Sequence, residues 1–137
     1  MKFKDDGNFI ILIMDDGEDF IQNIDRFIQE FKKEKIMTVV SALGMVKEIK
    51  MGFWNGKEYE IHEEKEPSEL LGISGVITPS TQPPYHFHIT VSTRDRKVKG
   101  GHLISSKVCN TIEMFLIKGN IDVKRKEEKG LKKLFFD

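Results

Sequence analysis

The spacing of apolar residues indicates one helix in a chain that otherwise has strand-like patterning. Between residues 18 and 35, Phe20, Ile24, Phe27, Ile28 and Phe31 recur at intervals of three and four. This spacing predicts an amphipathic helix with one apolar stripe. Acidic residues just before the stripe suit the positive N-terminal end of a helix. We therefore expect a single main helix.

The remaining segments have the length and alternation of strands. Residues 9–14 form a continuous apolar run between two Asp-Gly pairs, which predicts a buried strand. Apolar and polar residues alternate over 49–53 and 59–61, on either side of Asn55-Gly56, a dipeptide typical of a hairpin turn. Further strands are expected at 36–43, 70–78, 85–93 and 108–117, with 121–126 and 131–136 completing the sheet.

One helix among many strands, without alternating βαβ units, predicts an α+β domain with a mostly antiparallel, partly barrel-like sheet. The chain has 137 residues, so residues 1–137 are expected to form a single domain. Residues 9–14 and 114–117 look apolar on both faces, and one helix cannot cover all of these faces. This surplus of apolar surface predicts a homo-oligomer.

Charge and cysteine content restrict the expected partners and compartment. Lys plus Arg and Asp plus Glu number 22 each, so the formal net charge is zero, unlike the broad basic footprint of a nucleic-acid binder. The lone Cys109 cannot form an intramolecular disulfide, which fits the cytoplasm. Because no apolar run approaches the roughly 20 residues of a membrane span, no membrane partner is expected.

Three of the four histidines lie close together, in Tyr85-His86-Phe87-His88 and in Gly100-Gly101-His102. On a strand, His86 and His88 share a face and stand roughly 7 Å apart at the backbone, so both can reach one ion. The two glycines permit close backbone approach, which would help bring His102 to the pair. Three imidazoles suit zinc or another borderline divalent ion and leave a position open for water or substrate. The alternative is that each is an ordinary hydrogen-bonded imidazole.

Four other residues or groups of residues are candidates for a functional site. Glu113, on an otherwise apolar strand, is our candidate for a catalytic proton-transfer group, with a position at a sheet edge or solvent face as the alternative. Cys109 is expected to be a small buried hydrophobe, and His62 a solvated side chain. The aromatics Phe53, Trp54 and Tyr59 form either a ligand wall or ordinary packing.

Six short motifs occur in an order known from one family. They are Ser41-Ala42-Leu43-Gly44, Glu66-Pro67-Ser68-Glu69-Leu70, Gly72-Ile73-Ser74-Gly75, His86-Phe87-His88, Val98-Lys99-Gly100-Gly101-His102-Leu103 and Thr111-Ile112-Glu113. Through them, nearly the whole chain resembles the plant and prokaryote conserved (PPC) domain family. The resemblance implies an α+β domain that is usually a homotrimer, with a metal, commonly zinc, at His86, His88 and His102. The fold is also similar to that of acetolactate decarboxylase, whose zinc is held by three histidines.

The chain departs from the plant members of that family, which are DNA-binding proteins with AT-hook motifs. It has no Arg-Gly-Arg-Pro core, and its basic residues at 94–99 and 124–133 are interrupted by acidic or apolar ones, which is typical of solvated surface. The turn Asp95-Arg96-Lys97-Val98 also lacks the glycine that the family often has after the aspartate.

Three hypotheses follow. The first is a metal-binding homotrimer whose open three-histidine site binds a small-molecule ligand. The second is a zinc-dependent enzyme, with lyase or hydrolase-like chemistry, acting on a small carbonyl or carboxylate compound. The third is a DNA-binding or regulatory protein. No motif in the sequence identifies a substrate or a pathway.

Overall fold

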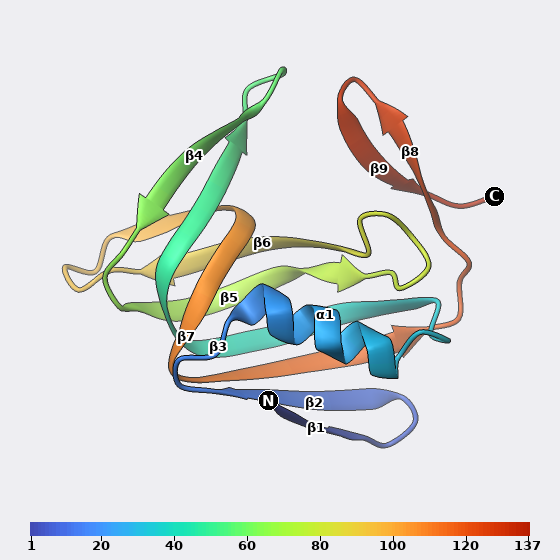
Figure 1. The fold of residues 1–137 in the computed structure, drawn as a ribbon, viewed down its shortest axis with the longest axis horizontal. Helices are drawn as coiled ribbons and strands as arrows, with labels where there is room; N and C mark the ends of the chain where they lie inside the picture. Colours follow the sequence, from blue (N-terminus) through green and yellow to red (C-terminus); the bar gives the residue numbers. More distant parts are fainter.

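A computed structural model describes residues 1–137 as nine strands and one helix (Figure 1). Seven strands form one antiparallel sheet in the order β1-β2-β7-β6-β5-β3-β4, and the single helix lies against it. The predicted α+β class with a mostly antiparallel sheet is therefore confirmed. The elements are β1 (Lys2–Asp5), β2 (Phe9–Asp15), α1 (Phe20–Glu30), β3 (Ile36–Trp54), β4 (Tyr59–Glu64), β5 (Ser68–Ile77), β6 (Tyr85–Ser92), β7 (Val98–Gly119), β8 (Lys124–Glu128) and β9 (Leu131–Phe135).

The barrel-like character comes from two long, bent strands. β3 pairs with both β5 and β7, while β6 pairs with β5 on one side and β7 on the other, so these four strands close into a ring. The β3–β7 register shifts at several places, one of them between Gly44 and Met45. Such bulges bend a strand and increase its twist. A Cβ on Gly44 would lie 2.0 Å from the Thr111 carbonyl oxygen, so this crossing requires glycine.

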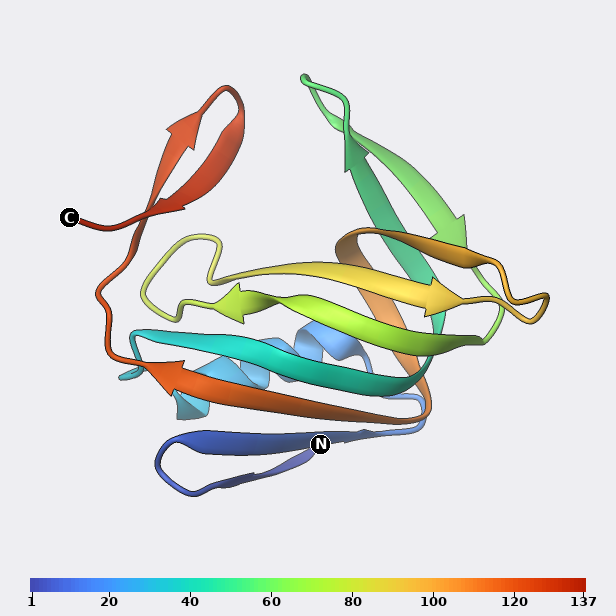
Figure 2. The ribbon, with the colours of Figure 1, turned by 180° about the vertical axis from the view of Figure 1, so that it is seen from behind.

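The helix covers one face of the sheet, as seen from both sides in Figures 1 and 2. Asp19 caps α1 by accepting a hydrogen bond from the backbone N–H of Gln22 at 3.0 Å. The predicted stripe is buried, and the Phe20 ring packs edge-on against Phe87 of β6 with their centroids 5.7 Å apart. The helix is shorter than the predicted 18–35 window, and it is neither long nor apolar enough to cross a membrane.

Several predicted strands differ from the observed ones. Within 9–14 the burial alternates, because Ile10, Leu12 and Met14 are fully buried while Ile11 is 36% exposed. The helix covers only one face of this strand, so within one chain the predicted burial holds for that face alone. Residues 36–43 and 49–53 belong to one strand, β3, and the segments around His102 and Glu113 belong to one strand, β7. Strand β1 was not predicted.

The largest difference concerns the C-terminus, where residues 121–126 and 131–136 do not complete the sheet. β8 and β9 pair only with each other, as a separate two-stranded sheet. Their sequences are dominated by charged side chains and provide no continuous apolar face for burial against the ring. This C-terminal hairpin instead rises beside the ring, opposite the β3–β4 hairpin (Figures 1 and 2).

Candidate metal centre

The structure brings the three predicted histidines together on one face of the β6–β7 pair. His88 lies directly opposite His102 in the antiparallel register, and His86 lies two residues away on the same face of β6. The Nε2 atoms of His86 and His88 are 3.2 Å apart. One ligand nitrogen from each of the three imidazoles lies within 4.8 Å of the other two. This geometry follows from strand alternation and antiparallel pairing.

The three residues fit a divalent metal ion. At a zinc–nitrogen distance of about 2.1 Å, two ligands of a tetrahedral site stand about 3.4 Å apart. The His86–His88 separation of 3.2 Å is close to this value, and the ligand nitrogen of His102 lies within 4.8 Å of both. In addition, Nδ1 of His102 is buried without a hydrogen-bond partner. Zinc or a similar ion would thus find three nitrogen ligands and keep one coordination position open.

The neighbouring backbone leaves no space for a side chain at Gly100 or Gly101. A Cβ on Gly100 would lie 2.7 Å from the Ile89 carbonyl oxygen, and one on Gly101 would lie 2.8 Å from the Gly52 carbonyl oxygen. The predicted close backbone approach is therefore confirmed. Neither glycine has a positive φ, so lack of space and not backbone torsion requires glycine at these positions.

The surroundings favour neutral imidazoles. Burial, with smaller contributions from the neighbouring His86 and His88, lowers the pKa of His102 to about 4. Burial also lowers the pKa of His86, with smaller contributions from His88 and Arg125. The neutral form is the one that binds metals. The ring of Tyr59 stacks on His102 at a centroid distance of 4.5 Å and fixes its orientation.

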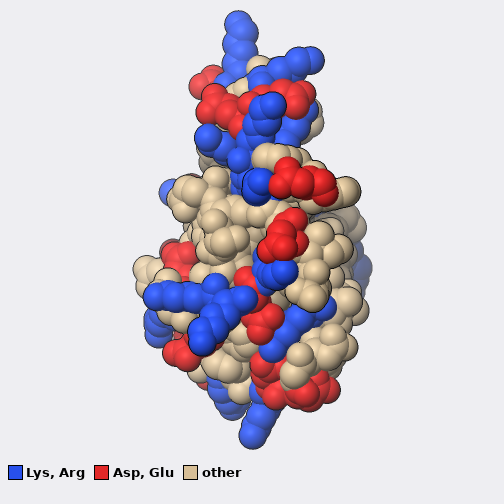
Figure 3. Space-filling model, turned by 90° about the vertical axis from the view of Figure 1, so that its right-hand side faces the viewer, with Lys and Arg blue, Asp and Glu red and all other residues tan.

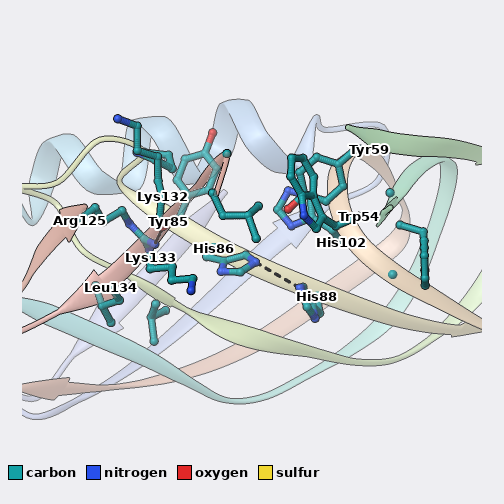
Figure 4. Close-up of a pocket in the computed structure, with 17 residues that line it drawn as sticks. Trp54, Tyr59, Tyr85, His86, His88, His102, Arg125, Lys132, Lys133 and Leu134 are labelled. Atoms are coloured by element: carbon teal, nitrogen blue, oxygen red, sulfur yellow. Dashed lines mark hydrogen bonds between the residues drawn. The ribbon is translucent and has the colours of Figure 1, made fainter. Parts of the chain in front are cut away.

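The histidines line a cleft of about 820 Å³ between the two hairpins. This volume lies in the range of small-molecule sites. Figure 4 places Trp54 and Tyr59 on the His102 side of the cleft, and Arg125 near His86 on the other side. Phe53, Trp54 and Tyr59 all line this cleft, so the structure is compatible with their interpretation as a ligand wall. The C-terminal hairpin contributes Arg125, Gly130, Leu131, Lys132, Lys133 and Leu134 to the lining.

The other candidate residues lie elsewhere. Glu113 is on β7, paired with Ile13 and Leu43, and does not line the cleft of its own chain; its catalytic role stays a prediction. His62 is exposed beside Glu64 and outside the cluster, as expected. Cys109 is partly exposed rather than buried.

Arg125 is the cleft residue that sequence reasoning missed. It belongs to a basic segment interpreted as solvated surface, yet the structure makes it part of the cleft wall. No local pattern distinguishes Arg125 from its neighbours Lys124 and Lys126. Its placement depends on how the C-terminal hairpin folds over the ring.

Comparison with known proteins identifies the family. The model of the Plants and Prokaryotes Conserved (PCC) domain matches residues 1–120, so the chain belongs to this family. This is the same family that the six sequence motifs resemble, and its name is abbreviated either PCC or PPC. A search of the curated proteins found no match.

Solved structures show the same fold. A PPC protein from Pyrococcus horikoshii is 21% identical with a TM-score of 0.80, and the match covers 96% of this chain and 92% of that one. A protein from Archaeoglobus fulgidus, described as metal-containing, is 29% identical with a TM-score of 0.78, covering 98% and 99%. A protein from Bacteroides thetaiotaomicron, provisionally described as DNA-binding, is 23% identical with a TM-score of 0.88, covering 98% and 96%.

Proposed function

We propose that this PCC-domain protein is a metal-binding homotrimer whose three histidines hold one divalent ion, zinc in the first instance. The observation that carries the proposal is the convergence of ligand nitrogens from His86, His88 and His102 within 4.8 Å. The metal-containing relative from Archaeoglobus fulgidus supports it. Three protein ligands leave a coordination position at which a small ligand would bind from the cleft.

In this proposal the protein residues have separate tasks. His86 and His88 would form a rigid pair on β6, and His102 would complete the set from β7 while the Tyr59 ring prevents its rotation. When bound, the metal would supply Lewis acidity at the open position.

Elemental analysis tests the metal site. Protein purified without chelator is expected to contain about one divalent ion per chain. Changing both His86 and His88 to Ala should remove the ion from a protein that remains folded by circular dichroism. His62→Ala is the matched control and should retain the ion, because His62 lies outside the cluster. Parent protein that stays metal-free, even after titration with zinc, would overturn the proposal.

The trimer is supported by an apolar outer surface that the helix does not cover. We define the outer face as Ile11, Val40, Leu43, Leu71 and Ile117; their exposed fractions range from 36% for Ile11 to 57% for Val40. Exposed large apolar side chains of this kind are typical of an interface between subunits. Light scattering should give three times the chain mass at micromolar concentration, and Leu43→Lys should lower that mass. A monomeric mass for the parent would refute the assembly.

A metal-dependent enzyme acting on a small carbonyl or carboxylate compound is the second candidate, favoured by the cleft beside the open position. Glu113 lies with the outer-face residue Leu43, so it would take part in proton transfer only at a neighbouring subunit's site. This candidate predicts turnover of small carbonyl compounds that is abolished by chelation and by His88→Ala. Turnover that survives both treatments would exclude the metal mechanism.

DNA binding has weaker support. The description of the Bacteroides thetaiotaomicron relative favours it, but Lys124, Lys132 and Lys133 are all paired with carboxylates. Figure 3 shows basic and acidic side chains interleaved over the C-terminal hairpin. Since nonspecific DNA affinity depends on unpaired positive charge, we expect little salt-sensitive binding to duplex DNA. Tight binding that weakens steeply with salt and is lost on neutralising Lys124, Arg125 and Lys126 would favour DNA instead.

A further inference from the structure

Arg125 is held firmly in the cleft wall with one nitrogen left unpartnered. Its Nε donates to the Thr81 hydroxyl at 3.3 Å, and its Nη1 donates to the Lys132 carbonyl at 3.0 Å. Nη2 is buried and has no hydrogen-bond partner. Buried donors in folded proteins nearly always have a partner, so an unpaired guanidinium nitrogen beside a cleft indicates a missing acceptor.

The charge of Arg125 is also uncompensated, unlike that of the other basic residues in this wall. Lys132 contacts Glu127 at 3.3 Å and Lys133 contacts Glu128 at 2.8 Å. Arg125 has no such carboxylate within salt-bridge distance. The cleft thus presents one fixed, unpaired positive charge, which suits a single negative charge better than a dianion.

The rest of the cleft is suited to the apolar body of a ligand. Trp54 and Tyr59 line the end near His102, while Tyr85 and Leu134 line the part near Arg125. The Trp54 and Tyr59 rings pack against each other with their centroids 5.2 Å apart, so this wall is rigid. Aromatic surfaces of this kind bind planar or aliphatic groups without fixing a hydrogen-bonding pattern.

We propose that the cleft binds a small organic carboxylate with an apolar or aromatic body. Its carboxylate accepts a hydrogen bond from Nη2 of Arg125, which a small shift of the side chain brings to the cleft surface. An oxygen at the ligand's other end occupies the open metal position. The inference rests on the proposed metal site, because the second contact requires the ion. The aromatic wall packs against the body between these ends.

Hydroxamates test the proposal, since the hydroxamate group anchors to a histidine-bound zinc. The probes are dicarboxylic acid monohydroxamates of increasing chain length, each compared with the hydroxamate of equal length that ends in a neutral amide. Affinities for the zinc-loaded protein are measured by isothermal titration calorimetry. At the length that spans the cleft, the carboxylate probe should bind about tenfold more tightly than its amide counterpart, as expected for one charge-assisted hydrogen bond.

Two variants locate the effect. Arg125→Met should abolish the tenfold advantage, because it weakens the carboxylate probe more than the amide probe. Lys126→Met removes a neighbouring positive charge that does not line the cleft, and should preserve the advantage. If Arg125→Met does not fold, the difference in affinity between the carboxylate and amide probes for the parent protein still tests whether the cleft prefers a carboxylate.

Each failure has a distinct signature. Equal affinity of carboxylate and amide probes at every length, or an advantage that persists in Arg125→Met, would overturn the carboxylate proposal and leave the metal site intact. Failure of every hydroxamate to bind, together with absence of zinc from the protein, would overturn the metal site and this proposal with it.

Discussion

The two faces of β6 are built from alternate residues of one strand and have opposite environments. Phe87, Ile89 and Val91 point under the helix and are almost completely buried. His86 and His88, interleaved with them, point to the other face and line the cleft. On the first face each side chain is enclosed by apolar neighbours. On the second, imidazole nitrogens stay accessible to a ligand.

This contrast predicts that stability and the proposed binding depend on alternating positions of the same backbone. Because the side-chain period of a strand is two, residues one position apart can be changed with effects on different properties. The helix-covered face should determine unfolding, and the cleft face should determine ligand binding. Four measurements test how complete that separation is.

The largest effect is expected from Phe87→Ala. It removes a ring that is 1% exposed and packs edge-on against Phe20, so it should lower the free energy of unfolding by about 3–5 kcal/mol. His88→Ala, the next residue along the strand, should cost less than about 1 kcal/mol in metal-free protein because His88 is exposed. Urea unfolding at fixed protein concentration measures both, and similar losses would contradict the separation of the two faces.

Gly52→Ala should affect both properties together. A Cβ at this position would lie 2.7 Å from Cδ1 of Tyr59, so the ring must move away from His102. We expect a loss of about 1–3 kcal/mol in unfolding free energy and weaker zinc binding by titration. Gly72→Ala is the control, since a Cβ there has open space within the chain. Unchanged zinc affinity in Gly52→Ala would show that Tyr59 does not position the ligand.

Acid should destabilise the metal-free protein through His102. Its pKa is lowered to about 4 by burial, whereas the unfolded chain titrates near 6.5. Between these values the unfolded state binds a proton that the folded state does not, so stability falls as pH falls from 6.5 to 4. We expect His102→Phe to reduce this loss by about 1 kcal/mol, measured by urea unfolding across the pH range. Equal slopes in parent and variant would exclude His102 as the source.

The smallest effect is expected from Lys133→Gln. This change breaks the ion pair with Glu128, in which both side chains are at least half exposed. Such surface pairs contribute about 0.5 kcal/mol or less, because water and salt screen them. Thermal unfolding should therefore hardly change. A large loss would mean that the C-terminal hairpin is coupled to the ring more strongly than its contacts indicate.

The sequence predicted features that depend on local periodicity. The stripe from Phe20 to Phe31 identified the helix, Asn55-Gly56 identified a hairpin, and alternation placed His86 and His88 on one face. His102 was expected to lie beside this pair, and the structure places it opposite His88 on the neighbouring strand. These features follow from backbone geometry acting over a few residues.

Features set by long-range packing were not predictable in this way. The bulges that join residues 36–54 into one strand depend on how β3 crosses β7. Separation of β8 and β9 from the sheet was missed because a strand's pattern does not specify its partner. The position of Arg125 depends on its contacts with Thr81 and Lys132, which exist only after the C-terminal hairpin has folded.

The independence of that hairpin has a consequence for how such a domain can evolve. The family match ends at residue 120, just before the hairpin, and β8 and β9 share no ladder hydrogen bonds with the ring. The hairpin meets the β3–β4 hairpin where Gly130 approaches Trp54. Mutations after residue 120 can therefore reshape one wall of the cleft without shifting any register of the ring. The wall that carries Arg125 can thus change in sequence while the ring that carries the three histidines keeps its geometry.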